Sequence, residues 1–268
     1  MLFRSDTPSP VTNIGFDFVL MGVPYSQFSV TENGLMRLGG TAITSSLYVI
    51  PSTTVPLISP FGNDMRVGTD GAVSYKLFGV APNRYLTVQW KNNMIRYATA
   101  AAGTATWEVR IYETTGVIQL VYGTMTTNAA SPTVYYVGFA VNTTSNNVLS
   151  VNTATHTASV TAPVTSNSYT ASSTITDLHS TADGSRRYYT FTPPAAAEAP
   201  TALNFTGVTG NDMVLNWTDS PDETSYAVYR SDDGGATYSF VASLAANTVT
   251  YDQSASLAPG TTYFWRVY

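Results

Sequence analysis

The sequence predicts an all-β protein of two antiparallel β-sandwich domains in series, and three observations support this. Thr is about one residue in seven of the 268, and β-branched residues favour strands. Charged residues make up only 11%, against a usual share of about 25%, so the Glu and Lys that long helices use are scarce. Segments of alternating apolar and polar residues recur along the chain, and no helical stripe competes with them.

A Pro- and Ala-rich segment marks the domain boundary. Thr192–Pro200 contains paired prolines, which cannot donate to a sheet, and no large apolar residue that could fill a core. It therefore predicts a short, stiff linker. We expect a large domain over residues 1–193, a linker over 194–200 and a small domain over 201–268.

Alternating residues predict the strands of the large domain. These strands cover residues 14–20, 28–30, 85–90, 107–112, 117–122 and 134–141. The pair Asn33-Gly34 predicts a tight hairpin turn, and residues 113–116 predict the turn of the clearest hairpin. The nearly continuous apolar stretch 134–141 predicts a central strand covered on both faces. Residues 142–185, rich in Thr, Ser and Asn, predict edge strands and long loops, and a strand ending at Phe191 closes the domain.

The small domain contains six predicted strands. They cover residues 202–206, 213–217, 226–230, 238–244, 248–251 and 263–268. Trp217 and Tyr226 lie on the second and third strands, and the segment Leu257-Ala258-Pro259-Gly260-Thr261-Thr262-Tyr263 resembles the turn before the sixth strand of fibronectin type III domains. The resemblance covers residues 199–268. It implies structural roles for these residues, including Leu257 and Pro259, with Trp217 in the core and Tyr263 capping the fold through a backbone hydrogen bond.

A fibronectin type III sandwich has seven strands, and the last one is missing from residues 199–268. It would pair along the sixth strand, so Tyr263, Trp265 and Val267 are predicted interface residues at an open aromatic edge. One explanation is that the chain is a piece of a longer protein. The other is that a neighbouring molecule donates the strand, with Leu2-Phe3-Arg4 as the candidate donor.

A second resemblance covers most of residues 12–193. The matching segments are Ile14–Phe18 (IGFDF), Glu32–Gly34 (ENG), Pro60–Asp64 (PFGND), Ala81–Asn92 (APNRYLTVQWKN) and Tyr112–Ile118 (YETTGVI). They resemble a β-sandwich domain of large secreted bacterial surface proteins, which often precedes fibronectin type III modules. The resemblance implies an extracellular or cell-surface location and implies no reaction.

Composition argues against several classes of protein. There is no Cys, so disulfides and thiolate metal sites are excluded. A net charge of −5 and a pI of about 4.8 argue against a nucleic-acid partner. No apolar run reaches the ~18 residues of a membrane span, so we expect no membrane insertion. The first residues lack the features of a signal peptide, so an exported protein would be present here as a mature form or a piece.

Few residues are candidates for catalysis. The only histidines, His156 and His179, have no acidic or Ser partner at motif spacing, which argues against a catalytic triad. Four carboxylates are candidates for a glycosidase pair, but we expect them on the solvated surface: Asp64, Asp70, Glu108 and Glu113. Cations on the same sheet face are expected to pair with Glu108 and Glu113: Arg84, Lys91, Arg96 and Arg110. We therefore predict no catalytic residue and no enzyme activity.

One group of oxygen-bearing side chains is a candidate cation site. Asn63, Asp64 and Asp70 lie within eight residues of one another, and Ca²⁺ takes several oxygens from one loop or from converging loops. No other cofactor is expected. The acidic segment Asp232–Gly235 predicts a plain hairpin turn, since Asp and Gly tolerate positive φ.

These features favour a non-catalytic structural or adhesive segment of a bacterial extracellular protein. Its partners would be other copies of itself or further domains of the same chain, and strand donation would build filaments. The alternative is a carbohydrate-binding accessory module of a secreted hydrolase, because exposed aromatic rings can stack on glycans. Four aromatics on predicted strands are candidates for this role, with packing in the sheet core as the competing interpretation: Trp90, Trp107, Tyr135 and Tyr136.

Overall fold

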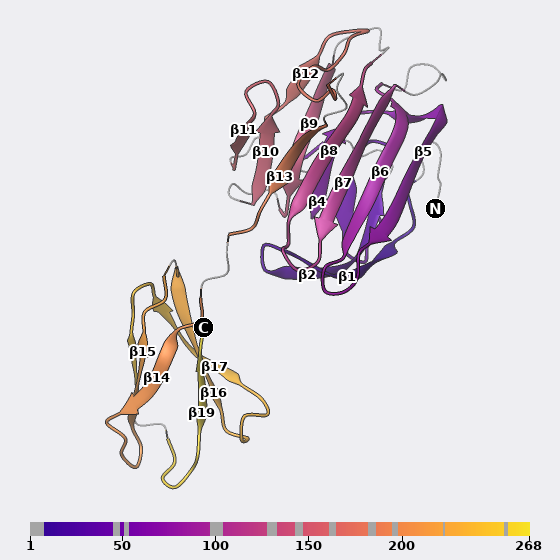
Figure 1. Ribbon diagram of the computed structural model, residues 1–268. Coiled ribbons are helices and arrows are strands. Elements are labelled where there is room, and N and C mark those ends of the chain that lie inside the picture. Colours follow the sequence, from indigo (N-terminus) through magenta and orange to yellow (C-terminus); the bar gives the residue numbers. More distant parts are fainter. Residues whose placement is uncertain are drawn as a thin grey trace. The chain divides into compact units, whose positions relative to one another are not determined.

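The computed structural model describes most of the chain, and every regular element in the described residues is a β-strand (Figure 1). The described residues are 8–44, 49–50, 54–96, 104–127, 133–142, 147–160, 165–181, 186–194, 198–221, 223–254 and 257–268. The chain divides into two compact units, Met1–Pro193 (unit 1) and Pro194–Tyr268 (unit 2).

Unit 1 contains an eight-stranded sheet. Its strand order is β1-β2-β3-β4-β9-β10-β11, and β12 pairs with β9. The strands are β1 (Thr12–Leu20), β2 (Val23–Val30), β3 (Met36–Leu38), β4 (Leu57–Gly62), β9 (Thr133–Ala140), β10 (Val148–Asn152), β11 (Thr157–Ser159) and β12 (Asn167–Tyr169). The predicted central strand is β9, which lies between β4 and β10, but its outer face is partly open because Val134 is 42% exposed.

A five-stranded sheet forms the second layer of unit 1, as Figure 1 shows. Its order is β13-β8-β7-β6-β5, with strands β13 (Arg187–Phe191), β8 (Ile118–Met125), β7 (Ala105–Tyr112), β6 (Tyr85–Met94) and β5 (Arg66–Phe78). Alternation on β7 turns Trp107, Val109 and Ile111 inward. Trp107 stacks on Trp90 of β6 with ring centroids 6.1 Å apart, so two indoles fill the centre of one core.

The predicted tight turn at Asn33-Gly34 is replaced by a longer, buried loop over residues 31–35. Thr31 N–H donates to the carbonyl of Leu35 (3.0 Å), and β2 pairs with β3 outside this loop. The Trp90 indole donates to the Thr31 carbonyl (2.7 Å), and the Asn33 side chain accepts from the Met65 amide (2.8 Å). The loop is therefore part of the core, and these contacts with residues distant in sequence explain why the local Asn-Gly pattern predicted a tight turn instead.

Unit 2 is a small sandwich of two three-stranded sheets. One has the order β14-β15-β18 and the other β17-β16-β19. The strands are β14 (Thr201–Thr206), β15 (Met213–Thr218), β16 (Ser225–Ser231), β17 (Ser239–Ala245), β18 (Thr250–Gln253) and β19 (Phe264–Val267). Leu215, Trp217, Tyr226, Val228, Leu257, Trp265 and Val267 form its core.

Candidate functional site

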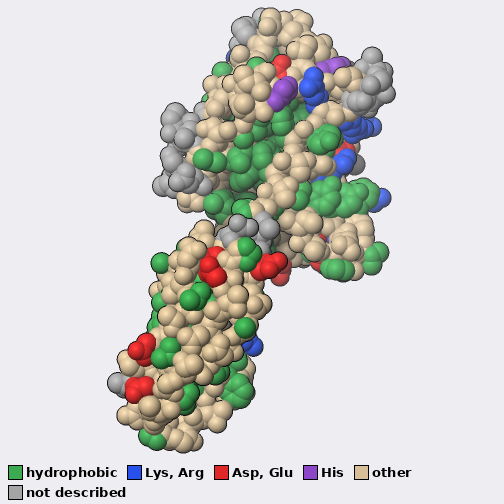
Figure 2. Space-filling view, turned by 60° about the vertical axis from the view of Figure 1, so that its left-hand side comes forward, with side chains coloured by type: hydrophobic (Ala, Val, Ile, Leu, Met, Phe, Trp, Pro, Cys, Tyr) green, Lys and Arg blue, Asp and Glu red, His purple; other side chains and the backbone are tan. Residues whose placement is uncertain are grey.

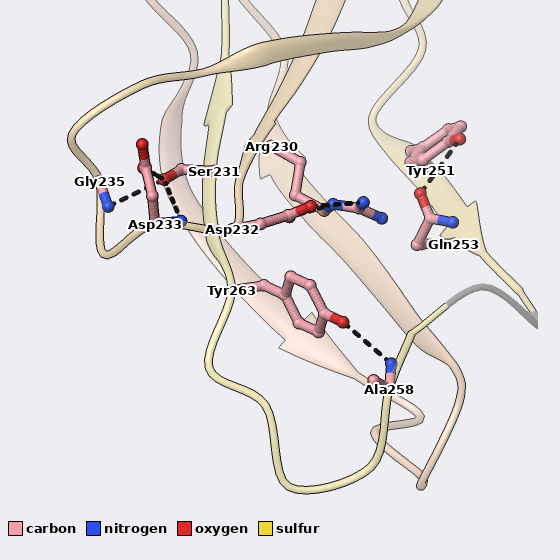
Figure 3. Close-up of polar contacts among 9 residues, drawn as sticks. All are labelled: Arg230, Ser231, Asp232, Asp233, Gly235, Tyr251, Gln253, Ala258 and Tyr263. Carbon is pink, nitrogen blue, oxygen red and sulfur yellow. Dashed lines mark hydrogen bonds and ion pairs between the residues drawn. The ribbon is translucent and has the colours of Figure 1, made fainter.

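The chain enters β19 through a rigid turn, shown in Figure 3. The Tyr263 hydroxyl accepts a hydrogen bond from the Ala258 amide (2.9 Å). The Arg230 guanidinium lies 5.0 Å from the centre of the Tyr263 ring, within cation–π range. Leu257 is buried in the core of unit 2, whereas Pro259 is exposed. The predicted capping bond of Tyr263 is therefore present, and it fixes the start of β19.

Trp217 and Tyr226 hold the centre of unit 2. Their rings meet edge to face with centroids 5.6 Å apart, and Trp217 is only 5% exposed. The Tyr226 hydroxyl accepts from the Ser220 amide (2.7 Å) and donates to the Asp219 carboxylate (2.8 Å). These contacts tie the β15–β16 connection to the core.

The acidic turn before β17 is closed by its own hydrogen bonds, as Figure 3 also shows in part. The Ser231 hydroxyl donates to Asp233 (2.7 Å) and accepts from the Gly235 amide (2.8 Å). Thr237 donates to Asp233 from both its amide and its hydroxyl. These bonds, led by that of the Thr237 side chain, lower the pKa of Asp233 to about 2. The carboxylates of this turn are thus used in ordinary turn bonding.

The two edges of β19 differ. On one edge, Ala227 of β16 and Tyr268 exchange two backbone hydrogen bonds (3.0 and 3.1 Å). Bonded and non-bonded pairs alternate in antiparallel sheets, so Arg266 also turns its backbone groups toward β16. The N–H and C=O groups of Trp265 and Val267 then point to the opposite edge, and no strand in the described part of the chain pairs there.

The side chains of β19 do not form the aromatic interface that the sequence predicted. Trp265 (8% exposed) and Val267 (9%) point into the core, because their positions alternate with outward ones. Their side chains belong to the core, and their outward backbone groups are what an added strand would bond. The outward side chains are Phe264, Arg266 and Tyr268, with Phe264 42% and Tyr268 57% exposed.

Aromatic rings form a row on the outer face of the same sheet. The Tyr229 ring of β16 meets Phe240 of β17 and Tyr268 edge to face, with centroid distances of 5.7 Å for both. Phe240 is 59% exposed. The Arg266 guanidinium lies 3.9 Å from the centre of the Tyr238 ring. Sequence reasoning missed this row because its members come from separate strands.

The aromatics predicted as sugar-stacking candidates are mostly core residues. Trp90, Trp107 and Tyr135 are fully buried, and Tyr136 is half-buried. An outward ladder of Phe78, Tyr85 and Tyr112 runs across β5, β6 and β7, with neighbouring rings stacked 5.1 Å apart. The stacked ring faces contact one another, so this ladder offers little face for a sugar ring.

The structure brings only two of the three predicted cation ligands to one place. Asn63 and Asp64 line a cavity of about 200 Å³, but the buried amide of Asn63 donates to a backbone carbonyl of β9. Arg96 lines the same cavity, and its positive charge opposes binding of a cation. Asp70 does not line this cavity, and its carboxylate accepts from the Asn92 side chain (2.7 Å). Within the described residues, no group of three or more His, Cys, Asp or Glu could hold a metal ion.

The carboxylates of the five-stranded sheet are paired with arginines. Glu108 accepts from Arg110 (2.7 Å) and Gln89 (2.8 Å), and Arg186 lies 3.9 Å away. Glu108 is only 7% exposed, so the prediction of a solvated carboxylate is wrong here, because these neighbours cover it.

The predicted pairing of Arg84 is present at the edge of the sheet. Arg84 forms a two-pronged ion pair with Glu113, and its hydrogen bonds lower the pKa of that carboxyl. Arg96 instead lines the cavity beside Asp64, and Lys91 is exposed. These two cations are therefore not paired as the sequence suggested.

The two histidines have separate partners. His156 Nδ1 contacts the Tyr189 hydroxyl (3.0 Å), and His179 Nδ1 accepts from the Met125 amide (3.0 Å). Neither arrangement resembles a Ser-His-Asp triad.

A buried polar network in unit 1 was not found from the sequence. Tyr135 and Thr153 hydroxyls lie 2.6 Å apart, the Thr153 hydroxyl donates to Asp177 (3.1 Å), and the Thr153 amide donates to the Asn167 side chain (2.8 Å). Burial raises the pKa of Tyr135. The network ties β9, β12 and segment 174–181 together, and its members are too far apart in sequence to form a motif.

The fold defines a protein of antiparallel β-sandwiches in series, and the second resembles a fibronectin type III domain in its strand order and tyrosine turn. A family model described as NIDO related matches residues 2–193. The chain therefore belongs to the NIDO-related family. No helix in the described residues is long and apolar enough to cross a membrane.

Two solved structures show a distant likeness to this chain. A segment of two fibronectin type III domains from chicken tenascin is 11% identical with a TM-score of 0.26, over 74% of this chain and 90% of that chain. Domains A168–A170 of titin are 11% identical with a TM-score of 0.25, over 99% of this chain and 91% of that chain. Scores this low carry no argument about function. A search of curated proteins finds no match to the sequence.

Proposed function

We propose that the chain is a non-catalytic structural or adhesive segment of a bacterial extracellular protein, and that the outer edge of β19 binds a β-strand, either from another copy or from further residues of the same protein. The observation that carries the proposal is the outward row of backbone groups on Trp265 and Val267. Such an edge is a template for another strand.

A comparison of the sheet edges in unit 2 singles out β19. β14 is interrupted by a register shift at Ala202, which has a φ of 55°, and β17 contains a bulge opposite Val228 and Tyr229. Bulges of this kind protect edges from pairing. β18 has a regular register, but three of its four residues are polar. β19 is regular and carries two core side chains, so it is the edge best suited to accept a strand.

The side chains of β19 define the chemistry of the added strand. Residues beside Trp265 and Val267 would complete the core and should be apolar. Residues on the outward side would flank Phe264, Arg266 and Tyr268, so a carboxylate opposite Arg266 would be favourable. The candidate donor Leu2-Phe3-Arg4 lies outside the described residues. It supplies apolar Leu and Phe but no carboxylate.

The test is concentration-dependent assembly, followed by light scattering and negative-stain microscopy. Donation by another copy predicts filaments, since a head-to-tail contact does not close on itself. Val267→Pro removes the outward amide without removing a bond to β16 and should prevent assembly. Val267→Ala, which keeps the amide and also shortens the side chain, is the matched control and should still assemble.

Truncation then identifies the donor. Removal of residues 1–7 keeps Ser9, which binds Val30 through both backbone and side chain, so unit 1 should remain folded. Loss of filaments in this variant supports donation by that segment. A chain that stays monomeric at all concentrations contradicts donation by another copy.

The second candidate function is a carbohydrate-binding module, favoured by the exposed rings of Phe240 and Tyr268. Glycan-array binding that disappears in Phe240→Ala, with unchanged assembly, would support it. Assembly without any glycan binding would support the structural function.

A further inference from the structure

A solvent-facing cavity of about 470 Å³ lies in unit 1. Its walls are Thr174, Thr176, His179, Ser180, Thr181 and Arg187. All but Arg187 belong to the segment after β12, and Arg187 is the first residue of β13. The volume is within the range of about 300–1,000 Å³ typical of small-molecule sites.

The walls of this cavity are held in place by backbone bonds to β8. The Ile175 amide donates to the Met125 carbonyl (2.9 Å), and the Ser180 amide donates to the Gly123 carbonyl (2.9 Å). Leu178 is fully buried in the core of unit 1. The segment is therefore anchored at three points, and the cavity is a built feature of the fold.

The side chains that line the cavity are hydrogen-bond donors. His179 Nδ1 accepts from the Met125 amide, so the proton of the neutral ring is on Nε2, which remains as a donor. Arg187 carries a permanent positive charge and five N–H groups. Thr174, Ser180 and Thr181 add hydroxyls, whereas the hydroxyl of Thr176 donates to Asp177. No Asp or Glu is among the described residues that line it.

We propose that this cavity binds an oxyanion, a carboxylate or sulfate group, with Arg187 as the charged partner and His179 Nε2 as a second donor. A guanidinium fits the two oxygens of such a group in parallel, which a single hydroxyl cannot do. Figure 2 shows His side chains close to Lys and Arg side chains on one face of unit 1, with an acidic side chain nearby.

Asp177 follows the lining residue Thr176 in the sequence but does not line the cavity itself. Its two oxygens accept from the hydroxyls of Thr153 (3.1 Å) and Thr176 (3.3 Å). Its charge still opposes an anion in the cavity. Asp177→Asn should therefore strengthen oxyanion binding rather than weaken it.

The experiment is a titration of the whole chain with inorganic sulfate and, separately, with glucuronate, followed by NMR and calorimetry. Low ionic strength is needed because dissolved salt would screen the attraction between the anion and this solvent-facing site. We expect saturable binding that Arg187→Gln weakens about tenfold or more, as for the loss of a charge-assisted bond. His179→Asn keeps an acceptor for the Met125 amide and should weaken binding by a smaller factor.

Arg186→Gln is the matched control. It removes the same charge one residue away, but Arg186 lies beside Glu108 and does not line the cavity. Its binding should stay within about twofold of the unchanged chain. Binding of sulfate and glucuronate alike indicates a general oxyanion site, and binding of glucuronate alone indicates an acidic saccharide. Equal losses in Arg186→Gln and Arg187→Gln, or no saturable binding of either anion, would overturn the proposal.

Discussion

Replacing Trp217 tests the packing of unit 2 in isolation. The indole is 5% exposed, meets Tyr226 edge to face and belongs to a small core of seven buried side chains among the described residues of unit 2. Trp217→Ala should therefore cost about 3–5 kcal/mol. A domain of this size is stable by about 4–11 kcal/mol, so the loss removes a large part of the total.

The indole N–H of Trp217 allows a second, independent test of the same site. It is buried, and no acceptor lies within hydrogen-bonding distance in the described structure. Trp217→Phe removes this donor together with some packing, so it should cost clearly less than Trp217→Ala.

Calorimetry on the two variants is the assay. We expect two transitions, with only that of unit 2 lowered in Trp217→Ala, because the two units have separate cores. A single transition that shifts as a whole would refute the reasoning, since it would show that the two units melt as one body.

Three further predictions concern single interactions. The pKa of Asp233 should be about 2 by NMR and should rise toward 3.8 in Thr237→Val. Because folding lowers this pKa, the ionised carboxylate stabilises unit 2 above pH 3.8, and this stabilisation is lost as pH falls toward 2. Tyr263→Phe should cost about 1 kcal/mol in unit 2, measured by denaturant titration, because the Ala258 amide is exposed and water replaces the lost bond. Gly34→Ala should lower the melting temperature of unit 1 alone, since its φ is +75° and a Cβ would lie 2.0 Å from the Phe61 carbonyl oxygen; an unchanged melting temperature would show that the buried loop can move.

The strands could be predicted because alternation on each strand is a local pattern. Trp107, Val109 and Ile111 on β7 point inward as their spacing requires, and the six predicted strands of unit 2 are all present. The resemblance to fibronectin type III domains also led to the hydrogen bond of Tyr263.

The site could be predicted only in part, because side-chain burial depends on contacts between distant segments. Glu108 is covered by Arg110 and Gln89, and the loop at Asn33 is covered by β6 and by the β4–β5 connection. The cavity beside Arg187 joins this residue to segment 174–181, which lies in the stretch predicted as edge strands and long loops. None of these contacts has a signal in the local pattern.

The central claim is that the outer edge of β19 binds a strand, and amide hydrogen exchange tests it most directly. In dilute protein, the outward amides of Trp265 and Val267 should exchange quickly, while those of Arg266 and Tyr268, bonded to β16, should be protected. In assembled protein, the amides of Trp265 and Val267 should become protected as well. Fast exchange at these two amides in fully assembled protein would contradict strand addition at β19.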